Sequence, residues 1–386
     1  MAFLPFYIPG RKRLRIVIAG GGYAGIAALT TFLRHMPEAD ITLVDPRPWH
    51  LKVTHLHETF RYPLDDCKVP FSELERRFGC RHLSARLPLE EEALLQWQRD
   101  KSVVVDGGTL EFDYLLIAVG AAVVRAERAE NILDLNDFMD AGGAGLLRER
   151  LDMHGHNGSA CISVAGGGAT GIQFLFEIAH FLRRHGLDAR LRLIHEGKRV
   201  LDGFTPHFST YVQARMTELD IDFHPDTRYR GQDAKRIFLE ECKTGRRFDL
   251  PSALSLLFLG IKPERLFPAN AFGQIMVGDR HLPNVFTAGD CSIHRSPGSD
   301  TLTAQSAVRK GKLAARNILR HSGVLGWLEP YLHRDLGYVV SLGPTDAVGW
   351  LALKDNVVSG MPALVIKEMV EAQYDLLLTG VDTYIP

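Results

Sequence analysis

Two glycine-rich segments carry the spacing of a dinucleotide-binding turn. Residues 20–25 read Gly-Gly-Gly-Tyr-Ala-Gly, and residues 166–171 read Gly-Gly-Gly-Ala-Thr-Gly. In a GxGxxG turn the first glycine permits a tight bend, the second lets the backbone approach a pyrophosphate, and the third lets a helix pack close to a strand. A single GxGxxG is equally typical of an ordinary glycine-rich turn. Two copies in one chain indicate two dinucleotide sites.

The elements around the first turn form a strand–helix–strand unit. An apolar strand at 14–19 precedes the turn, a helix follows from Ile26 to about His35, and a second strand covers 41–44. This second strand ends in Asp45, twenty residues beyond Gly25. A carboxylate at that distance can accept hydrogen bonds from an adenosine ribose, while the helix N-terminus offers free N–H groups to the phosphates.

The elements around the second turn repeat this arrangement. The chain predicts a strand at 160–165, a helix from Ile172 to about Arg184 and a strand at 191–194, which runs into His195-Glu196. Glu196 would accept from the ribose hydroxyls and repel a 2′-phosphate, which favours NADH. The cations at 198–199 could instead accept the phosphate of NADPH, so the coenzyme stays open, with NADH preferred.

Composition limits the class of protein. The 386 residues predict two or three domains, and the formal net charge of −1 argues against nucleic acid as a partner. No apolar run has the roughly 18–20 residues of a membrane span. The apolar start at 1–8 precedes its basic residues, the reverse of a secretory signal, so we expect a cytoplasmic protein, with peripheral contact to the inner face of the cell membrane left open.

The cysteines and histidines do not suggest a disulfide framework or a metal site. The five cysteines are scattered, with no CxxC pair. His50, His55 and His57 lie close together but show no Cys or acidic partner at the spacing of metal ligands. We expect no metal.

Five segments together resemble the flavoprotein reductases that have two dinucleotide domains. They read GGGYAG, LLIAVG, GGGATG, LGIKP and VFTAGD, and they span most of the chain. The resemblance implies an α/β fold with two Rossmann-like domains, the NAD domain inserted in the FAD domain, and a C-terminal α+β segment. The implied parts are an FAD-binding domain at 1–122 and 276–325, an NAD(P)H-binding domain at 123–275 and a C-terminal interface or acceptor segment at 326–386.

The same resemblance implies the cofactors, FAD and NADH (or NADPH), and their contacts. Asp290 would bind the FAD ribityl chain, and the helix that begins near Ala304 would aim its N–H groups at the flavin. The residues expected to contact a cofactor are Gly20, Gly22, Tyr23, Ala24, Gly25, Asp45, Pro46, Arg47, Ala118, Gly120, Gly166, Gly168, Ala169, Thr170, Gly171, Glu196, Gly260, Gly289, Asp290, Ala304 and Gln305.

Within these reductases the chain is most similar to type II NADH dehydrogenases, which pass electrons to quinone. Segments 41–51, 303–312 and 338–348 carry the likeness, the second as an AQxAxQ-like helix and the third as a C-terminal strand. Two positions depart from the family pattern, with Gln173 where the family has an acid and Arg309 where it has glutamine. Glu177 matches a second family acid, and the implied catalytic residues are Gln173, Glu177 and Gln305.

The electron acceptor stays open between several classes. A quinone or other small acceptor comes first, followed by a small protein electron carrier. A sulfide:quinone reductase would need cysteines beside the flavin, and a nucleotide-sensing flavoprotein would turn over little. Residues 361–378 predict an amphipathic helix suited to membrane contact, a quinone tunnel, core packing or a homodimer interface. Its expected apolar stripe is Leu364, Ile366, Met369, Val370, Tyr374 and Leu377, opposite a polar face with Glu368, Glu371, Asp375 and Lys367.

Overall fold

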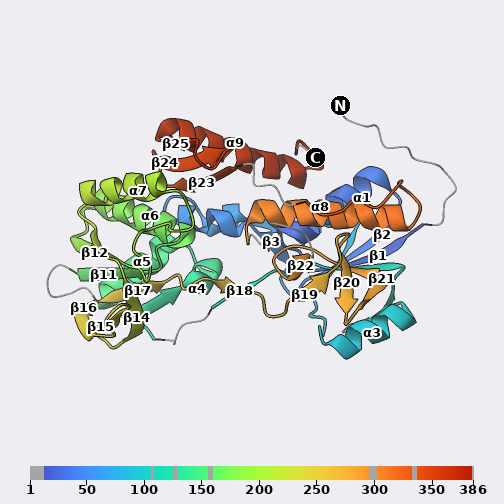
Figure 1. The fold of residues 1–386 in the computed structure, drawn as a ribbon, viewed down its shortest axis with the longest axis horizontal. Coiled ribbons are helices and arrows are strands. Elements are labelled where there is room, and N and C mark those ends of the chain that lie inside the picture. Colours follow the sequence, from blue (N-terminus) through green and yellow to red (C-terminus); the bar gives the residue numbers. More distant parts are fainter. Residues whose placement is uncertain are drawn as a thin grey trace.

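The chain folds around two separate β-sheets that are joined side by side and crossed by the C-terminal segment (Figure 1). The computed structural model describes residues 13–105, 108–124, 129–154, 160–294, 302–332 and 337–384. The apolar start at 1–8 lies outside these ranges. The predicted mixed α/β class with two parallel-strand sheets is confirmed.

The first sheet is built around the first glycine turn. Its strand order is β22-β19-β20-β21-β8-β1-β2-β5, and β1 pairs in parallel with both β2 and β8. The central strands β1 and β8 are short and mostly apolar, as expected for strands that are covered on both faces. The bounds of the five parallel strands are β1 Arg15–Ala19, β2 Asp40–Val44, β5 Arg81–Leu83, β8 Tyr114–Ile117 and β21 Arg280–Thr287.

The chain returns to the first sheet earlier than the sequence predicted. We placed the return at residue 276, but β19 (Phe267–Ala269) and β20 (Gln274–Val277) are hydrogen-bonded into this sheet beside β21 and β22 (Ser292–His294). These strands pair partly antiparallel, so they lack the strand–helix–strand pattern on which the predicted boundary depended.

The second sheet is built around the second glycine turn. Its order is β10-β17-β11-β12-β13, with all neighbours parallel. Two antiparallel strands, β9 (Ala122–Val123) and β18 (Ile261–Lys262), pair where the chain passes between the sheets. The bounds are β10 Ile132–Asp134, β11 Ala160–Ala165, β12 Ala189–Ile194, β13 Asp222–His224 and β17 Leu254–Leu257, with an added antiparallel sheet of β14 Thr227–Gln232, β15 Arg236–Glu241 and β16 Arg247–Pro251.

Two helices of the first half pack unusually close together. They are α1 (Tyr23–His35) and α8 (Ala304–His321), and a Cβ on Gly311 of α8 would lie 2.1 Å from the Ala24 carbonyl oxygen. This approach holds the N-termini of both helices at the same edge of the sheet. In the second half α6 (Ala169–His185) takes the place of α1.

Shorter elements complete the two halves. Their bounds are β3 Trp49–Leu51, η1 Val53–Phe60, η2 Leu64–Cys67, β4 Lys68–Pro70, α2 Phe71–Phe78, α3 Glu91–Asp100, β6 Ser102–Val105, β7 Gly108–Glu111, α4 Leu135–Asp140, α5 Gly143–His154 and α7 Pro206–Glu218. Strands β6 and β7 form the predicted hairpin, whose Asp-Gly turn lies outside the described residues.

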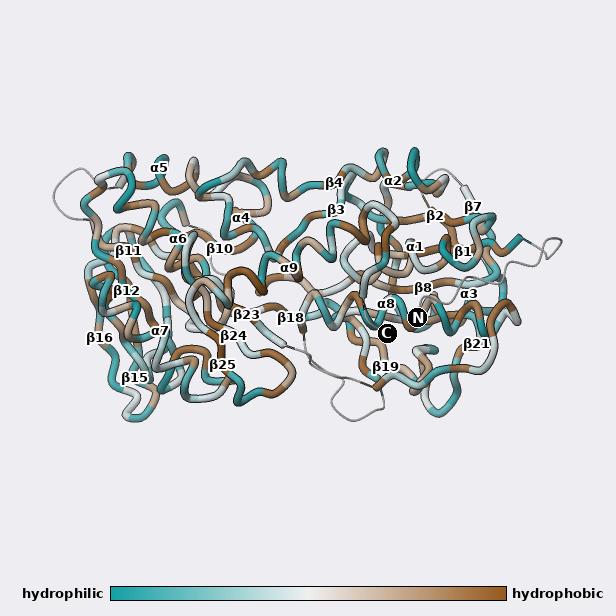
Figure 2. The backbone as a smooth tube through the Cα atoms, turned by 90° about the horizontal axis from the view of Figure 1, so that it is seen from above, coloured by the Kyte–Doolittle hydropathy of each residue, from teal (hydrophilic) through white to brown (hydrophobic). Residues whose placement is uncertain are grey.

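The C-terminal segment lies across both halves (Figures 1 and 2). The stretch predicted as one strand at 338–348 is a hairpin of β23 (Gly337–Ser341) and β24 (Ala347–Leu351), joined by β25 (Val357–Ser359). The predicted helix is confirmed as α9 (Met361–Leu378). Among the described residues, no helix has the length and apolar character needed to cross a bilayer.

The predicted orientation of α9 is wrong in part. Tyr374 and Leu377 are buried as expected, but Met369 and Val370 of the same expected stripe are exposed. Lys367, which we placed on the polar face, is buried instead. Lys367 is buried because its ammonium group pairs with the carboxylates of Glu58 and Glu371.

Candidate functional site

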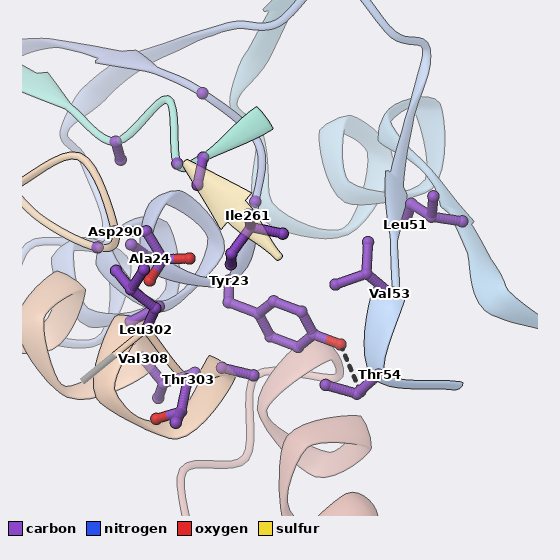
Figure 3. A pocket seen from close by; sticks show the side chains of 18 of the residues that line it. Tyr23, Ala24, Leu51, Val53, Thr54, Ile261, Asp290, Leu302, Thr303 and Val308 are labelled. Carbon is purple, nitrogen blue, oxygen red and sulfur yellow. Dashed lines mark hydrogen bonds between the residues drawn. The ribbon is translucent and has the colours of Figure 1, made fainter. Parts of the chain in front are cut away.

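One large cavity connects the two halves and the C-terminal segment. It has a volume of about 1510 Å³, larger than the roughly 300–1,000 Å³ of a site for one drug-sized ligand. Its walls come from the first glycine turn, from the start of α6, from η1, from the start of α8, and from β23, β24 and α9. Figure 3 shows the part around Tyr23, where Asp290, Thr303 and Val308 approach from one side and Val53 and Thr54 from the other.

The first glycine turn has the geometry of a pyrophosphate cradle. Gly20 has a φ of +105°, and a Cβ on Gly25 would lie 1.9 Å from the Gly20 carbonyl oxygen, so neither position accepts a side chain. Gly22 lines the cavity, and a Cβ there would meet no atom within 4 Å. Helix α1 begins without a side-chain cap, so the N–H groups of its first turn are available to an anion.

The second glycine turn has the same geometry. Gly166 has a φ of +117°, and a Cβ on Gly171 would lie 1.9 Å from the Gly166 carbonyl oxygen. The space beside Gly168 is open, and α6 also begins without a side-chain cap. Each half of the protein therefore presents an uncapped helix N-terminus over an unobstructed glycine.

The residue that follows the second strand differs between the two halves. Asp45 accepts a hydrogen bond from the Gly21 N–H at 2.7 Å through one carboxylate oxygen. At the equivalent place His195 accepts from the Gly167 N–H at 3.1 Å through Nδ1. The other Asp45 oxygen accepts from the Arg47 N–H at 2.9 Å and from Arg47 Nε at 3.3 Å, so only part of its acceptor capacity is left for a ribose, whereas the imidazole has used its one acceptor.

The acid expected in the second site points elsewhere. The Glu196 carboxylate pairs with the Arg228 guanidinium through two contacts of 3.0 Å and does not line the cavity. The end of β12 therefore offers no unpaired carboxylate to a nicotinamide nucleotide.

Asp290 and α8 form the wall expected to face the flavin. Burial raises the pKa of the Asp290 carboxyl to about 6, and the nearby Lys310 ammonium only partly offsets this effect. Gly289 has a φ of +79°, which lets the chain turn so that Asp290 reaches the cavity. Ala304 and Gln305, at the start of α8, line the same cavity. These groups fit the ribityl chain and the ring edge of FAD.

An aromatic cluster connects the first glycine turn to α9. The His50 Nδ1–H donates to the Gly21 carbonyl at 2.9 Å, and His50 Nε2 lies 3.0 Å from the Tyr374 hydroxyl. Burial lowers the pKa of His50 to about 4, so the ring is neutral and its Nε2 accepts from Tyr374. The Tyr23 ring packs on both, with its hydroxyl bonded to Thr54 at 2.8 Å (Figure 3). Through these contacts α9 holds the turn that is expected to bind FAD.

Gln173 lies at the junction of the second turn and the C-terminal hairpin. Its amide Nε2 donates to the Ser341 hydroxyl at 3.2 Å, and this hydroxyl lies 2.9 Å from His57 Nε2. Burial lowers the pKa of His57 to about 3, so the ring stays neutral. Gln173, Ser341 and His57 therefore form a hydrogen-bonded group without a charged member. Gln173 lines the cavity as part of this group.

Glu177 lies behind the cavity wall, one helical turn further along α6. Its carboxylate is buried and contacts the Arg61 guanidinium at 3.0 Å. Burial raises the pKa of Glu177, and Arg61 opposes the shift. Glu177 does not line the cavity, and its described contact is with Arg61.

Four ionisable side chains from η1 and α9 form what we call the α9 charge cluster: His55, Glu58, Lys367 and Glu371. The Lys367 ammonium lies 2.8 Å from Glu58 and 2.6 Å from Glu371. His55 Nδ1 is 3.1 Å from Glu58, and His55 Nε2 is 3.9 Å from Glu371. Three members, His55, Lys367 and Glu371, line the cavity.

Most of the predicted site residues meet at this cavity. Those that line it are Gly20, Gly22, Tyr23, Ala24, Asp45, Pro46, Arg47, Ala118, Gly120, Ala169, Thr170, Gln173, Gly289, Asp290, Ala304 and Gln305. Those that do not are Gly25, Gly166, Gly168, Gly171, Glu177, Glu196 and Gly260. Three glycines of this second group, Gly25, Gly166 and Gly171, shape the turns through backbone packing.

The sequence analysis missed the α9 charge cluster and the contacts of His50. The grouping of His50, His55 and His57 was the available signal, but we looked for metal ligands and overlooked Glu58 beside them. The second acid, Glu371, lies more than 300 residues away in the chain, so no local spacing could indicate it.

The cysteines do not face the cavity. The structure describes all five, and none is among the residues that line it. Cys67, Cys80 and Cys291 are buried, and burial raises the pKa of each thiol, to about 11 for the first two. A buried thiol with a raised pKa is a poor nucleophile. This placement agrees with the expectation that thiol chemistry is absent from the site.

Known proteins share this sequence pattern and this fold. The model of the family described as "Pyridine nucleotide-disulphide oxidoreductase" matches residues 14–311. A type II NADH:quinone oxidoreductase of Staphylococcus aureus is 23% identical over 407 residues, which cover 96% of this chain and 97% of that protein.

Solved structures agree at lower identity. The sulfide:quinone oxidoreductase of Aquifex aeolicus superposes with a TM-score of 0.77 at 16% identity, covering 95% of this chain and 92% of that one. NDH2 of Plasmodium falciparum in complex with NADH gives a TM-score of 0.76 at 15% identity, covering 96% of each chain. At these identities the structures establish a shared fold.

Proposed function

This chain belongs to the pyridine nucleotide-disulphide oxidoreductase family, and from that premise we propose that it is an FAD-dependent enzyme that oxidises NADH and reduces a quinone. One observation carries the proposal. A single cavity touches the first glycine turn, the helix that follows the second glycine turn, and the C-terminal hairpin with α9. Bound FAD would supply a two-electron relay between nucleotide and acceptor.

The two halves would hold the two nucleotides. In the first half, the uncapped α1 N-terminus and open Gly22 suit the FAD pyrophosphate, and Asp45 suits its ribose. In the second half, α6 and Gly168 suit the pyrophosphate of NADH. Gln173 then lies where the nicotinamide amide would enter, and it orients that group by hydrogen bonding.

A quinone would occupy the part of the cavity that borders the C-terminal segment. Tyr338, Trp350, Ile366 and Val370 line this part and offer apolar contact to a planar ring. The relatives named as NADH:quinone oxidoreductases support this acceptor, and the absence of cysteine from the cavity wall disfavours sulfide.

The outer face of α9 supports peripheral contact with a membrane, where lipid-soluble quinones are found. Met361, Val365, Met369 and Leu376 are exposed and repeat at helical spacing, and Leu353 of the adjoining loop is 72% exposed. The test is co-sedimentation with phospholipid vesicles. We expect the double substitution Val365→Ser and Met369→Ser to abolish binding, and Val104→Ser, an exposed apolar residue on β6, to leave it unchanged. A wild-type protein that stays in the supernatant contradicts membrane contact.

Steady-state NADH oxidation tests the activity itself. We expect the purified FAD-loaded protein to reduce a short-chain quinone and ferricyanide at the expense of NADH. Reduction of ferricyanide without reduction of quinone would contradict the proposed acceptor. A flavin that NADH does not bleach would contradict the proposed electron donor.

A further inference from the structure

With their carboxylates ionised, the α9 charge cluster and its neighbours Arg61 and Glu177 carry one more negative charge than positive charges. Its carboxylates are Glu58 and Glu371, and Glu177 lies next to it behind Arg61. Against these three acids stand two permanent cations, Arg61 and Lys367. One additional proton, held by the Glu371 carboxyl group 3.9 Å from His55 Nε2, makes the group neutral.

Burial favours the protonated form of Glu371. The pKa of Glu371 is raised by burial, an effect that His55 and Lys367 oppose. For Glu58, burial also acts to raise the pKa, but the hydrogen bond from His55 and the charge of Lys367 outweigh it, so its pKa is lowered. The exchangeable proton of the cluster therefore belongs to Glu371, which lines the cavity, and not to Glu58, which does not.

The proposed reaction needs such a proton. A hydride from NADH carries two electrons and one proton, whereas a quinone takes up two electrons and two protons to form a quinol. The balanced equation is NADH + H⁺ + quinone → NAD⁺ + quinol. One proton per turnover must therefore enter from solvent and reach the acceptor in the cavity.

Four neighbouring polar groups, Gln173, His57, Tyr23 and Tyr374, are poor sources of this proton. Gln173 is an amide and does not titrate near neutral pH. His57, whose pKa burial lowers to about 3, remains neutral. The pKa values of Tyr23 and Tyr374 are raised by burial, so their hydroxyls hold their protons.

We propose that Glu371, paired with His55, donates the proton that the quinone takes up, and that Lys367 and Glu58 hold this pair at the cavity wall. The inference rests on the proposed quinone reductase function. It assigns acid–base chemistry to α9, a helix that the sequence analysis considered only for membrane contact, a quinone tunnel, core packing or a homodimer interface.

The experiment compares acceptors that differ in their need for protons. Ferricyanide accepts one electron and no proton, whereas a short-chain quinone must be protonated. The FAD-loaded wild type, Glu371→Gln and the matched control Glu368→Gln, an exposed residue of the same helix, are reduced with NADH and then mixed with each acceptor across pH 5.5–9. His55→Gln provides a second variant of the pair.

We expect Glu371→Gln to slow reoxidation by quinone about 10²-fold, the low end of the range for a general acid, with ferricyanide reoxidation unchanged. The wild-type quinone rate should fall as pH rises through the raised pKa of Glu371, and this fall should be absent in Glu371→Gln. As a readout independent of activity, the infrared difference spectrum between reduced and oxidised protein should contain a carboxyl band that Glu371→Gln removes and Glu368→Gln retains.

Quinone rates that match the wild type in both Glu371→Gln and His55→Gln would overturn the inference. Equal slowing with both acceptors would also overturn it, because that pattern indicates a structural role. A wild type that NADH cannot reduce, or that quinone cannot reoxidise, would overturn the proposed function and the inference with it.

Discussion

A single methyl group placed at either glycine turn should separate the two nucleotide sites. Gly168 and Gly22 both have ordinary extended backbone, with φ near −77° and −79°, and both have open space where a Cβ would lie. Alanine is therefore compatible with the fold at both positions. Its methyl group would occupy the space into which a pyrophosphate must move to reach the N–H groups of the helix.

The magnitude follows from the contacts that the methyl group prevents. A hydrogen bond to a charged group contributes about 1.5–3 kcal/mol, and each 1.4 kcal/mol changes affinity about tenfold. Loss of one N–H···phosphate contact should weaken binding by roughly 10- to 150-fold. We expect Gly168→Ala to raise the Kd for NADH by this factor while FAD content stays normal, and Gly22→Ala to weaken FAD in the same way.

The assay measures the rate of flavin bleaching against NADH concentration, with FAD content and the melting temperature as controls. Gly171→Ala serves as the contrasting variant, since its Cβ would lie 1.9 Å from the Gly166 carbonyl oxygen and should prevent correct folding. The reasoning is refuted if Gly168→Ala binds NADH as tightly as the wild type, or if it loses FAD while keeping NADH.

Three further predictions concern single charged or polar groups. In the FAD-free protein the pKa of Asp290 is raised to about 6. The folded state therefore binds more protons than the unfolded state between about pH 4 and 6, so the free energy of unfolding should fall as pH rises through this window. Urea unfolding should show that Asp290→Asn removes this dependence. His195 stands at the end of β12, where the first half has a carboxylate. We therefore expect His195→Asp to raise the ratio of kcat/KM for NADH to kcat/KM for NADPH about tenfold or more. An unchanged ratio would argue against a role of His195 in coenzyme choice. Lys367→Met leaves the partly buried carboxylates of Glu58 and Glu371 without their shared cation. It should lower the free energy of unfolding by about 3 kcal/mol at pH 7, the low end for a buried pair, with a smaller loss at pH 5, as measured by denaturant titration.

The parts of the fold that depend on local pattern were predictable from the sequence. Each glycine turn is specified by neighbours within 30 residues, so its strand, helix and following strand could be placed with small errors at the ends. The helix at 361–378 was found for the same reason. The boundary at 276 failed because β19 and β20 join the first sheet through partners that periodicity does not reveal.

The chemistry on α9 was not predictable, because it depends on contacts across most of the chain. Lys367 contacts Glu58, 309 positions away in the sequence, and this contact together with Glu371 explains why an ammonium lies on the buried face of the helix. A prediction that buries only apolar residues therefore places Lys367 on the wrong face of this helix. Likewise, the sequence predicted Glu196 as the acid that binds the ribose, whereas in the structure its carboxylate pairs with Arg228.

The most direct test of the central claim is a two-step anaerobic stopped-flow experiment on the yellow FAD-loaded protein. One equivalent of NADH is added first, and a short-chain quinone is added after the flavin absorbance has settled. We expect the absorbance to disappear on the first mixing and to return on the second, within one turnover. A protein that binds no FAD, or whose flavin colour is unchanged by NADH, would contradict the claim that one cavity brings flavin and nicotinamide together.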